Sequence, residues 1–329
     1  MNFIKSQDWN NKLKNAQPHE NLGLFSENPF SLYVSLIKGD LRPSNFWNSV
    51  HFRFKFAIRS LLMPVSTFQI LRFLTSSPSG FEIISAQPRI PCRIQRPYLS
   101  TAVSRRESID AIKYHYQLLD DKIKTHGIRK HLSQNGIELC SFHGKDGGEY
   151  VVRFISTYRL DKEGESSIIV STSSGVMLSE ITFTFCKRIG LRTVIIGGLQ
   201  GPNHNGAQAE IKAATKNMYG LFPKRVALES LIFLAEEMGI ESILAVSNEN
   251  HVYNSARYRS RSKLMHSDYN AFWEMSGGEI LPDGFYNLPT KILKKNLEEV
   301  ASKKRSEYRS RYKLIDRLSD CIRSSLECG

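Results

Sequence analysis

The first stretch that could do chemistry is the loop IIGGLQGPNHNG at residues 195–206. An apolar run typical of a strand leads into Gly197, Gly198, Gln200 and Gly201, and helix-forming sequence resumes directly after the loop. Glycines allow a ligand to approach the backbone closely, and a helix N-terminus presents free N–H groups to an anion. The loop is therefore either a phosphate-binding turn or a tight corner. Because it matches neither GxGxxG nor GxxxxGKS, the loop alone favours the corner.

A second candidate anion site lies in the segment YGLFPKRVALESL, residues 219–231. Pro223 predicts the first turn of a helix, with Lys224 and Arg225 directly after it. Cations are unfavourable at that end of a helix dipole, so a bound phosphate or a nearby carboxylate would relieve the mismatch. If this helix start meets the glycine loop in the fold, the two segments form one site for an anionic or phosphorylated ligand.

A third group is Asn248, Glu249 and His251 in AVSNENHVY, residues 245–253. These polar side chains come just after a predicted buried strand, a place where α/β proteins often carry reactive groups. We interpret them as candidate catalytic residues for acid–base work. The alternative is a hydrogen-bonded loop, because the sequence contains no HExxH, GxSxG or recognisable Cys–His pair.

Basic residues also gather near the C-terminus, in SKKRSEYRSRY at residues 302–312. They are Lys303, Lys304, Arg305, Arg309 and Arg311. Such a cluster can bind the phosphates of lipid or RNA, or it can form a solvated helical face. The five cysteines are scattered, without CxxC pairs or zinc spacing, so the sequence predicts neither a metal site nor disulfides.

The elements that must position these groups change character along the chain. Helical periodicity holds at 104–125, where Ser104 and Glu107 match a capping box. Strand-like runs follow at 150–160, 166–190 and 191–198, then helices and a further strand. This order predicts an α+β fold with a mostly antiparallel sheet flanked by helices. The predicted parts are a polar leader (1–43), a helical N-terminal region (44–145), an α+β core (146–290) and a basic C-terminal helix (291–329).

The segment 44–76 is apolar and aromatic with interspersed Arg and Lys. Ser44 is a candidate helix cap, and Pro64 would break or kink the helix. Such a helix can lie on a membrane surface, or it can pack against the core with its Arg stems along the surface. The pattern favours packing.

Charge and composition bound the functional class. The chain has 329 residues, of which 41% are hydrophobic and 23% are charged, which excludes wholesale disorder. The formal net charge is +13, with 14 Lys and Arg against 7 Asp and Glu in residues 1–110 and 11 against 6 in residues 291–329. Basic ends indicate an anionic partner. Without a signal segment or a long apolar run, we expect a cytoplasmic protein, free or in peripheral contact with the inner membrane.

Taken together, five stretches resemble a known family. They are IGGLQGP, ATKNMYGLFPK, AVSNENHVY, FWEMSGGEILPDGFYNLP and KKRSEYRSRYKLID. In this order and spacing the chain resembles the VirK/YbjX family of Gram-negative bacteria, from about residue 45 to the C-terminus. The resemblance implies a virulence-associated protein that supports outer-membrane display of a surface autotransporter, envelope remodelling and resistance to antimicrobial peptides. It supplies no catalytic residues.

A second resemblance concerns the core, which is similar to the GCN5-related N-acyltransferases. It rests on antiparallel strands, a long helix at 223–238, the strand ILAVSN and the Asn and Tyr that follow. This resemblance implies an acyl-CoA or acyl carrier as cofactor, with its phosphates held before the long helix. The usual Q/R-x-x-G-x-G/A motif of those enzymes is absent.

Three functional hypotheses remain open from the sequence. The first is an acyltransferase acting on an envelope lipid or protein. The second is a non-enzymatic, chaperone-like factor that assists a surface protein. The third is an RNA-binding regulator, which the lack of an RNP or KH signature disfavours. Whether the protein is an enzyme is left open.

Overall fold

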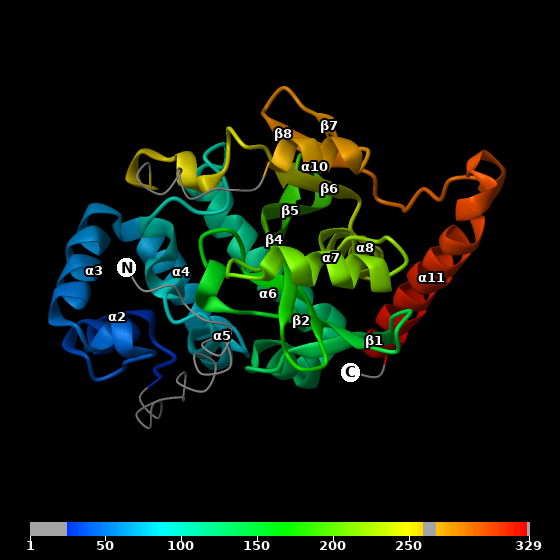
Figure 1. Ribbon diagram of the computed structural model, residues 1–329. Helices are drawn as coiled ribbons and strands as arrows, with labels where there is room; N and C mark the ends of the chain where they lie inside the picture. Colours follow the sequence, from blue (N-terminus) through cyan, green and yellow to red (C-terminus); the bar gives the residue numbers. More distant parts are fainter. Residues whose placement is uncertain (1–24, 259–267, 328–329) are drawn as a thin grey trace.

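The computed structural model describes residues 25–258 and 268–327 (Figure 1). The α-helices are α2 (Pro29–Lys38), α3 (Val50–Leu62), α4 (Pro64–Ser76), α5 (Gly80–Ala86), α6 (Arg105–Leu132), α7 (Ala207–Asn217), α8 (Pro223–Glu237), α10 (Tyr269–Met275) and α11 (Arg305–Glu327). Short 3₁₀ helices are η2 (Asn45–Asn48), η3 (Ile90–Gln95), η4 (Tyr158–Leu160), η5 (Val252–Asn254), η6 (Ala256–Tyr258), η7 (Leu297–Glu299) and η8 (Ser302–Lys304).

One sheet of eight strands runs through the protein in the order β1-β2-β3-β4-β5-β6-β8-β7. The strands are β1 (Ile137–His143), β2 (Glu149–Ile155), β3 (Ser166–Thr172), β4 (Met177–Arg188), β5 (Leu191–Gln200), β6 (Ser242–Val246), β7 (Glu279–Ile280) and β8 (Phe285–Leu288). Each neighbouring pair is antiparallel except β5 and β6. That pair is parallel because a helical crossover, rather than a hairpin, joins the two strands.

Helices cover the sheet in layers. Helix α6 packs against β4, whereas α8 packs on β3 and β4 and α11 packs on β1 and α8. The helices α2 to α5 form a further group beside α6, to the left in Figure 1. A single cluster of buried apolar side chains extends through all of these elements. The N-terminal helices therefore share one core with the sheet.

Local signals explain where several helices begin. Ser104 accepts the Glu107 N–H and Glu107 accepts the Ser104 N–H, so the predicted capping box of α6 is confirmed. Pro64 is the first residue of α4, where its missing N–H is tolerated. The helix predicted over 44–76 is thus two helices, and Ser49 caps α3 rather than Ser44.

The predicted α+β class, with a mostly antiparallel sheet and a C-terminal helix, is confirmed. Several elements were not anticipated, among them α5, α10, β7 and β8. Strand β1 lies within the range 44–145, which the sequence assigns to a helical region, and α2 lies within the range 1–43, which it assigns to a polar leader. Leu32 and Leu36 of α2 are fully buried, so this helix packs as part of the core.

Two further expectations concern cysteines and membrane spans. The four described cysteines, Cys92, Cys140, Cys186 and Cys321, are free thiols. In the part of the chain that the structure describes, no helix has the length and apolar character needed to cross a membrane.

Candidate functional site

A short segment that leads into β3 lies flat against β4 and β5. A Cβ added to Gly164 would meet the backbone of Phe183, and a Cβ added to Gly197 would overlap the carbonyl oxygen of Glu163. A Cβ at Gly198 would overlap the Glu163 carboxylate. The close approach that the paired glycines predict therefore occurs, and the group that approaches is the chain's own Glu163.

The strand is irregular at the same point. Phe183 pairs with Ile196 and Thr182 pairs with Gly198, which leaves Gly197 as an extra residue in β5. Such a bulge re-aims the strand and often lies next to a functional site. Here it sets the backbone of β5 against Glu163.

The carboxyl group of Glu163 is fully buried. Gln200 Nε2 donates to both of its oxygens at 3.1 Å. Burial raises the pKa of Glu163 to about 7, against the opposing effects of Gln200, Lys162, Arg159 and Tyr253. A carboxyl that titrates near neutrality can exchange a proton at physiological pH, which an ordinary exposed glutamate does poorly.

Beyond this bulge, β5 and β6 diverge. Their pairing ends at Ile196 and Ala245. Past that point Tyr269 reaches from α10 to β5, where its hydroxyl accepts the Leu199 N–H at 3.3 Å. Trp273 Nε1 donates to the Val246 carbonyl at 2.8 Å on the other strand. Side chains of α10 thus bridge the fork between the two strands.

His251 lies in the same fork and is buried. Its ring centroid is 5.3 Å from that of Tyr269 and 5.0 Å from that of Tyr253. Burial lowers the pKa of His251 to about 4, and contact with the backbone of Gly197 acts in the opposite direction. Nδ1 accepts the Tyr253 N–H at 3.2 Å, so the neutral ring carries its proton on Nε2. We call Glu163, Gln200, Gly197, Gly198, His251 and Tyr269 together the Glu163 site.

The other two members of the predicted catalytic trio lie elsewhere. Asn248 accepts the Tyr269 N–H at 2.9 Å and so fixes the start of α10. Glu249 is exposed and accepts both bonds from Asn270 Nδ2 at 3.2–3.3 Å. The pKa of Glu249 is lowered by its own backbone N–H and by Asn270. These three residues are close in sequence but have different surroundings. Of the three, only His251 contacts the bulge, at Gly197.

The two predicted halves of an anion site meet in part. A Cβ added to Gly201 would lie 3.9 Å from Lys224 Cε, so these residues are neighbours. Burial lowers the pKa of the partly buried Lys224. Arg225 turns away and pairs with Glu229 at 2.9 Å. A carboxylate one turn along therefore relieves the unfavourable position of Arg225, as the sequence allows.

The predicted basic cluster at the C-terminus is divided in the structure. Arg305 Nε donates to the Val300 carbonyl at 3.0 Å, and Arg311 Nε donates to the Tyr219 carbonyl at 3.0 Å. Lys303, Lys304 and Arg309 are exposed. The two arginines hold the start of α11 in place, which leaves three cations facing solvent.

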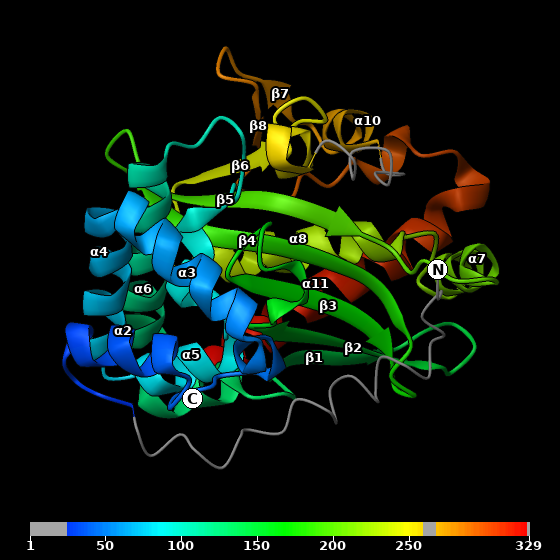
Figure 2. The same ribbon diagram turned by 90° about the vertical axis from the view of Figure 1, so that its left-hand side faces the viewer.

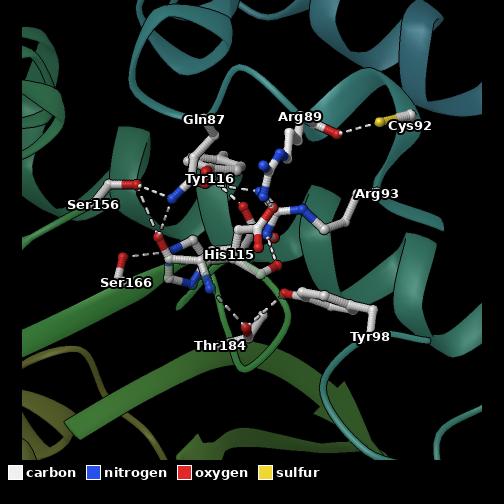
Figure 3. A network of polar contacts seen from close by, with 12 residues as sticks. Gln87, Arg89, Cys92, Arg93, Tyr98, His115, Tyr116, Ser156, Ser166 and Thr184 are labelled. Carbon is white, nitrogen blue, oxygen red and sulfur yellow. Dashed lines mark hydrogen bonds and ion pairs between the residues drawn. The ribbon is translucent and has the colours of Figure 1, made fainter. Parts of the chain in front are cut away.

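A second polar cluster lies just beyond the Glu163 site, between the N-terminal helices and β3 (Figure 3). Arg93 pairs with Glu165 at 3.0 Å, both fully buried, and the Tyr116 hydroxyl donates to Glu165 at 2.8 Å. Gln87 accepts from Arg93 at 2.7 Å and donates to Ser156 at 3.0 Å. These bonds satisfy most of the buried polar groups, so the cluster joins layers rather than presenting a reactive group.

His115 belongs to this interior as well. It accepts the Phe185 N–H on Nδ1 at 3.0 Å, so its Nε2 donates to the Ser166 hydroxyl at 2.8 Å. Burial holds its pKa well below the usual range. Because the ring is fully buried and both of its nitrogens are hydrogen-bonded, His115 has a structural role. In the described ranges no group of acidic, histidine or cysteine side chains is arranged to hold a metal ion.

Comparison with known proteins gives the family. Residues 45–324 match the family described as "Protein of unknown function (DUF535)". The chain belongs to the DUF535 family. The "Uncharacterized protein YbjX" of Escherichia coli (strain K12) is 42% identical to this DUF535 chain over 286 residues, which cover 87% of each protein. The resemblance to the VirK/YbjX family is confirmed.

More distant relatives of this DUF535 chain also match. An "Uncharacterized protein" of Haemophilus influenzae is 29% identical over 217 residues, which cover 66% of this chain and 70% of that protein. The "Membrane protein LapB" of Mannheimia haemolytica is 23% identical over 198 residues, which cover 59% and 82%. No solved structure matches. The GCN5-related resemblance of the core therefore stays a proposal.

Sequence analysis did not identify two residues of the Glu163 site, Glu163 itself and Tyr269. Glu163 lies in DKEGE, residues 161–165, which predicts only a break between strands. The one available signal was the glycine pair on β5, which requires a close neighbour without naming it. Tyr269 could be linked to β5 only through the position of α10 in the fold.

Proposed function

We propose that this protein is a group-transfer enzyme with a GCN5-related core that moves an acyl group onto an envelope lipid or protein. The single observation that carries the proposal is Glu163, a buried carboxyl with a pKa of about 7, set against a glycine bulge where β5 leaves β6. Strand β5 is followed by α7, by the long helix α8 and by β6, which pairs with β5 in parallel; the long helix and the strand ILAVSN are features on which the GCN5-related resemblance rests.

Glu163 is proposed as the general base. In its ionised form the carboxylate accepts the proton that an acceptor amine or hydroxyl loses when it attacks. A pKa near the operating pH keeps both the ionised and the protonated form populated, which is the condition for efficient proton transfer. Gln200 orients the carboxylate through two bonds of 3.1 Å, and neutral His251 and Tyr269 line the fork beside it.

An acyl donor that carries phosphate, such as acyl-CoA or an acyl carrier, can be tested against the residues present. The Leu199 N–H donates to the side-chain hydroxyl of Tyr269 at 3.3 Å. A donor carbonyl could replace that hydroxyl, and Lys224 beside Gly201 could bind a donor phosphate. These residues fit such a donor. When bound, it supplies an acyl group activated as a thioester.

The proposal that the acceptor lies in the cell envelope is supported by the relatives of this protein rather than by the geometry of the site. The VirK/YbjX resemblance implies envelope remodelling, surface display of an autotransporter and resistance to antimicrobial peptides. The Mannheimia haemolytica relative is named a membrane protein. An acceptor in the envelope, a lipid or a surface protein in transit, fits both.

The test uses the full chain with acyl-CoA and an envelope lipid extract, and measures CoA thiol released. Glu163→Gln should lower the rate at least about a hundredfold, because a general base contributes that much, with donor binding unchanged. Lys224→Ala should instead weaken donor binding about tenfold, from the loss of one charge-assisted bond.

Glu249→Gln is the matched control, since it removes an exposed carboxylate at the end of the neighbouring strand. It should keep full activity. If CoA and acyl-CoA cause no saturable thermal shift, or if Glu163→Gln and Glu249→Gln behave alike, the enzyme proposal fails. The non-enzymatic, chaperone-like hypothesis then takes its place.

A further inference from the structure

Helix α3 carries an apolar stripe that the described protein leaves uncovered. The large apolar side chains that are at least 42% exposed here are Val50, Phe54, Ile58, Leu61 and Leu62 on α3, with Val65 and Phe68 on α4. Residues three and four positions apart share one side of a helix, so the α3 members form one stripe. In Figure 2, which looks onto the N-terminal helices, α3 lies in front of α4 and α6. Exposed apolar patches of this kind mark interaction sites.

The opposite side of α3 packs against the rest of the protein. Phe56 and Ser60 are buried there, and Trp47 stacks edge-on against Phe56 with ring centroids 5.2 Å apart. The helix therefore packs, as the sequence favours, and presents its other side outward at the same time. The two readings of the segment 44–76, packing helix and surface helix, apply to opposite sides of α3.

A pocket of about 210 Å³ opens beside the stripe. The basic side chains that line it are His51, Lys55, Arg59, Arg96 and Arg257. The first three are spaced by four residues along α3, so they form a line parallel to the apolar stripe. No Asp or Glu is present among the described residues that line this pocket.

These cations lack a counterion from the described chain. Burial, and then the neighbouring Arg257 and Arg96, lower the pKa of Arg59. Arg96 Nε is buried and has no hydrogen-bond partner among the described residues. Like charges held this close are unfavourable unless an anion lies between them. The pocket is therefore complementary to a phosphate group.

We propose that α3 and the start of α4 dock on an anionic phospholipid bilayer, with the apolar stripe at the acyl-chain boundary and the basic pocket around a lipid phosphate. We call the stripe and the pocket together the α3 face. A helix that carries an apolar side and flanking cations lies in the plane of such an interface, where apolar burial and attraction to anionic lipid act together.

The pairing of the two features selects a bilayer over other anions. RNA supplies phosphates but no apolar phase, so it would leave Leu61 and Leu62 in water. A free phosphate would fill the pocket and leave the stripe unexplained. The pocket is also smaller than the roughly 300–1,000 Å³ usual for drug-sized ligands. It suits a headgroup phosphate whose acyl chains stay outside, beside the stripe.

The α3 face also lies close to the Glu163 site. A second pocket, of about 480 Å³, shares Gln95 and Arg96 with the first and is lined by Ser100 as well. Ser100 forms a β-bridge with His251. If the proposed function holds, a bilayer at the α3 face would bring acceptor lipids to the side of the molecule that carries His251; the docking proposal itself does not depend on this.

The test is flotation of the full chain with vesicles of pure phosphatidylglycerol or pure phosphatidylcholine. The protein should bind the anionic vesicles and not the zwitterionic ones, and added salt should weaken binding. Phe54→Gln with Ile58→Gln should reduce binding at least about tenfold through lost apolar burial. Lys55→Gln with Arg59→Gln should reduce it about fivefold per cation.

Matched controls lie elsewhere on the surface. Leu293→Gln removes an apolar side chain that is 82% exposed, and Lys122→Gln with Lys130→Gln removes two exposed cations of α6. Both should bind vesicles as the unaltered protein does. All substituted positions are exposed or line the pocket, so each variant should fold, which circular dichroism checks.

Four outcomes would overturn the proposal. They are equal binding to both vesicle types, unchanged binding by both α3 variants, loss of binding on Lys303→Gln with Lys304→Gln instead, and saturable binding of inorganic phosphate or RNA without vesicle binding. The ratio of CoA release between the wild type and Glu163→Gln does not depend on vesicle binding, so the two proposals can fail separately.

Discussion

The Glu163 site and the α3 face differ in where their ionisable side chains lie and in what surrounds them. At the Glu163 site an ionisable group is fully buried, and glycine backbone, Gln200 and the aromatic rings of the fork surround it. At the α3 face the cations line an open pocket beside exposed apolar side chains. The first region satisfies its polar group internally, whereas the second leaves both its charge and its apolar surface for something outside the chain.

This difference teaches where a substitution should affect folding and where it should affect binding. Buried polar groups are expensive when a partner is lost, because the protein interior offers no water to replace it. Exposed side chains contribute little to stability, whatever they bind. The predictions below test whether the two regions separate in this way, from the largest expected effect to the smallest.

The largest loss of stability should come from adding one carbon atom, a Cβ, to a glycine of β5. Gly197→Ala places a Cβ on the backbone carbonyl of Glu163, which cannot move without shifting the whole segment. The loss of stability should exceed about 4 kcal/mol. Gly198→Ala meets the Glu163 side chain instead. Glu163→Ala should therefore rescue Gly198→Ala and leave Gly197→Ala unrescued in urea unfolding. Equal rescue of both variants would mean that contact with a residue other than Glu163 requires glycine at these two positions.

Next in size is the buried ion pair behind the Glu163 site. Arg93→Ala leaves the Glu165 carboxylate buried with the Tyr116 hydroxyl but without its cation. The expected loss is about 3–5 kcal/mol. Arg129→Ala is the matched control, since the Arg129 side chain is 63% exposed where it pairs with Glu82, and it should cost less than about 1 kcal/mol. If calorimetry showed similar losses of stability for the two variants, the expected difference between buried and exposed ion pairs would be wrong.

A third prediction uses pH to isolate Glu163. Its folded pKa is about 7 against an ordinary 4.5. Between these values the unfolded chain has released the proton and the folded chain still holds it, so the stability of the wild type falls as pH rises. Relative to Glu163→Gln, which cannot ionise, the wild type should lose about 3 kcal/mol between pH 4.5 and 7 and nothing further above.

The control for this titration is Glu299→Gln, an exposed carboxyl on η7. It should not reproduce the pH-dependent difference that Glu163→Gln shows. Comparing each variant with the wild type cancels the contributions of the buried histidines, which are the same in both. A flat curve for Glu163→Gln would show that the carboxyl is already ionised in the folded protein.

The smallest effect is expected on the α3 face. Phe54→Gln replaces an apolar side chain that is 61% exposed, so the free energy of unfolding should change by less than about 0.5 kcal/mol. A loss of several kcal/mol in urea unfolding would show that Phe54 is covered in solution, and the α3 face would then cease to be an open surface.

Much of the fold could be read from local signals. Pro64 and Pro223 mark helix starts, the Ser104–Glu107 box marks another, and Gly239 ends α8 with a positive φ of 70°. Each of these depends on neighbours along the chain. The strands from β2 to β6 were visible for the same reason, through runs of β-branched and aromatic residues.

The site was less accessible to sequence reasoning because its contacts are long-range. Glu163 and Gly198 are far apart in the chain, and nothing in DKEGE distinguishes a buried carboxyl from a carboxylate in an exposed turn. The adjacent pair Asn248 and Glu249 looked catalytic, yet the turn after β6 directs both toward α10. Residue type alone indicated which side chains could do acid–base chemistry, whereas three-dimensional position decides which carboxyl is buried.

The crowding of cations at the pocket of the α3 face has a consequence for how the protein would evolve under selection in the laboratory. Burial and the neighbouring Arg257 and Arg96 lower the pKa of Arg59, so the charge of Arg59 is unfavourable in the free protein and a bound anion would relieve it. Selection for heat resistance alone, without any demand for activity, should therefore discard these residues early. The positions that are substituted first in such an experiment would identify the residues of the proposed binding pocket by their effect on stability, before any ligand is known.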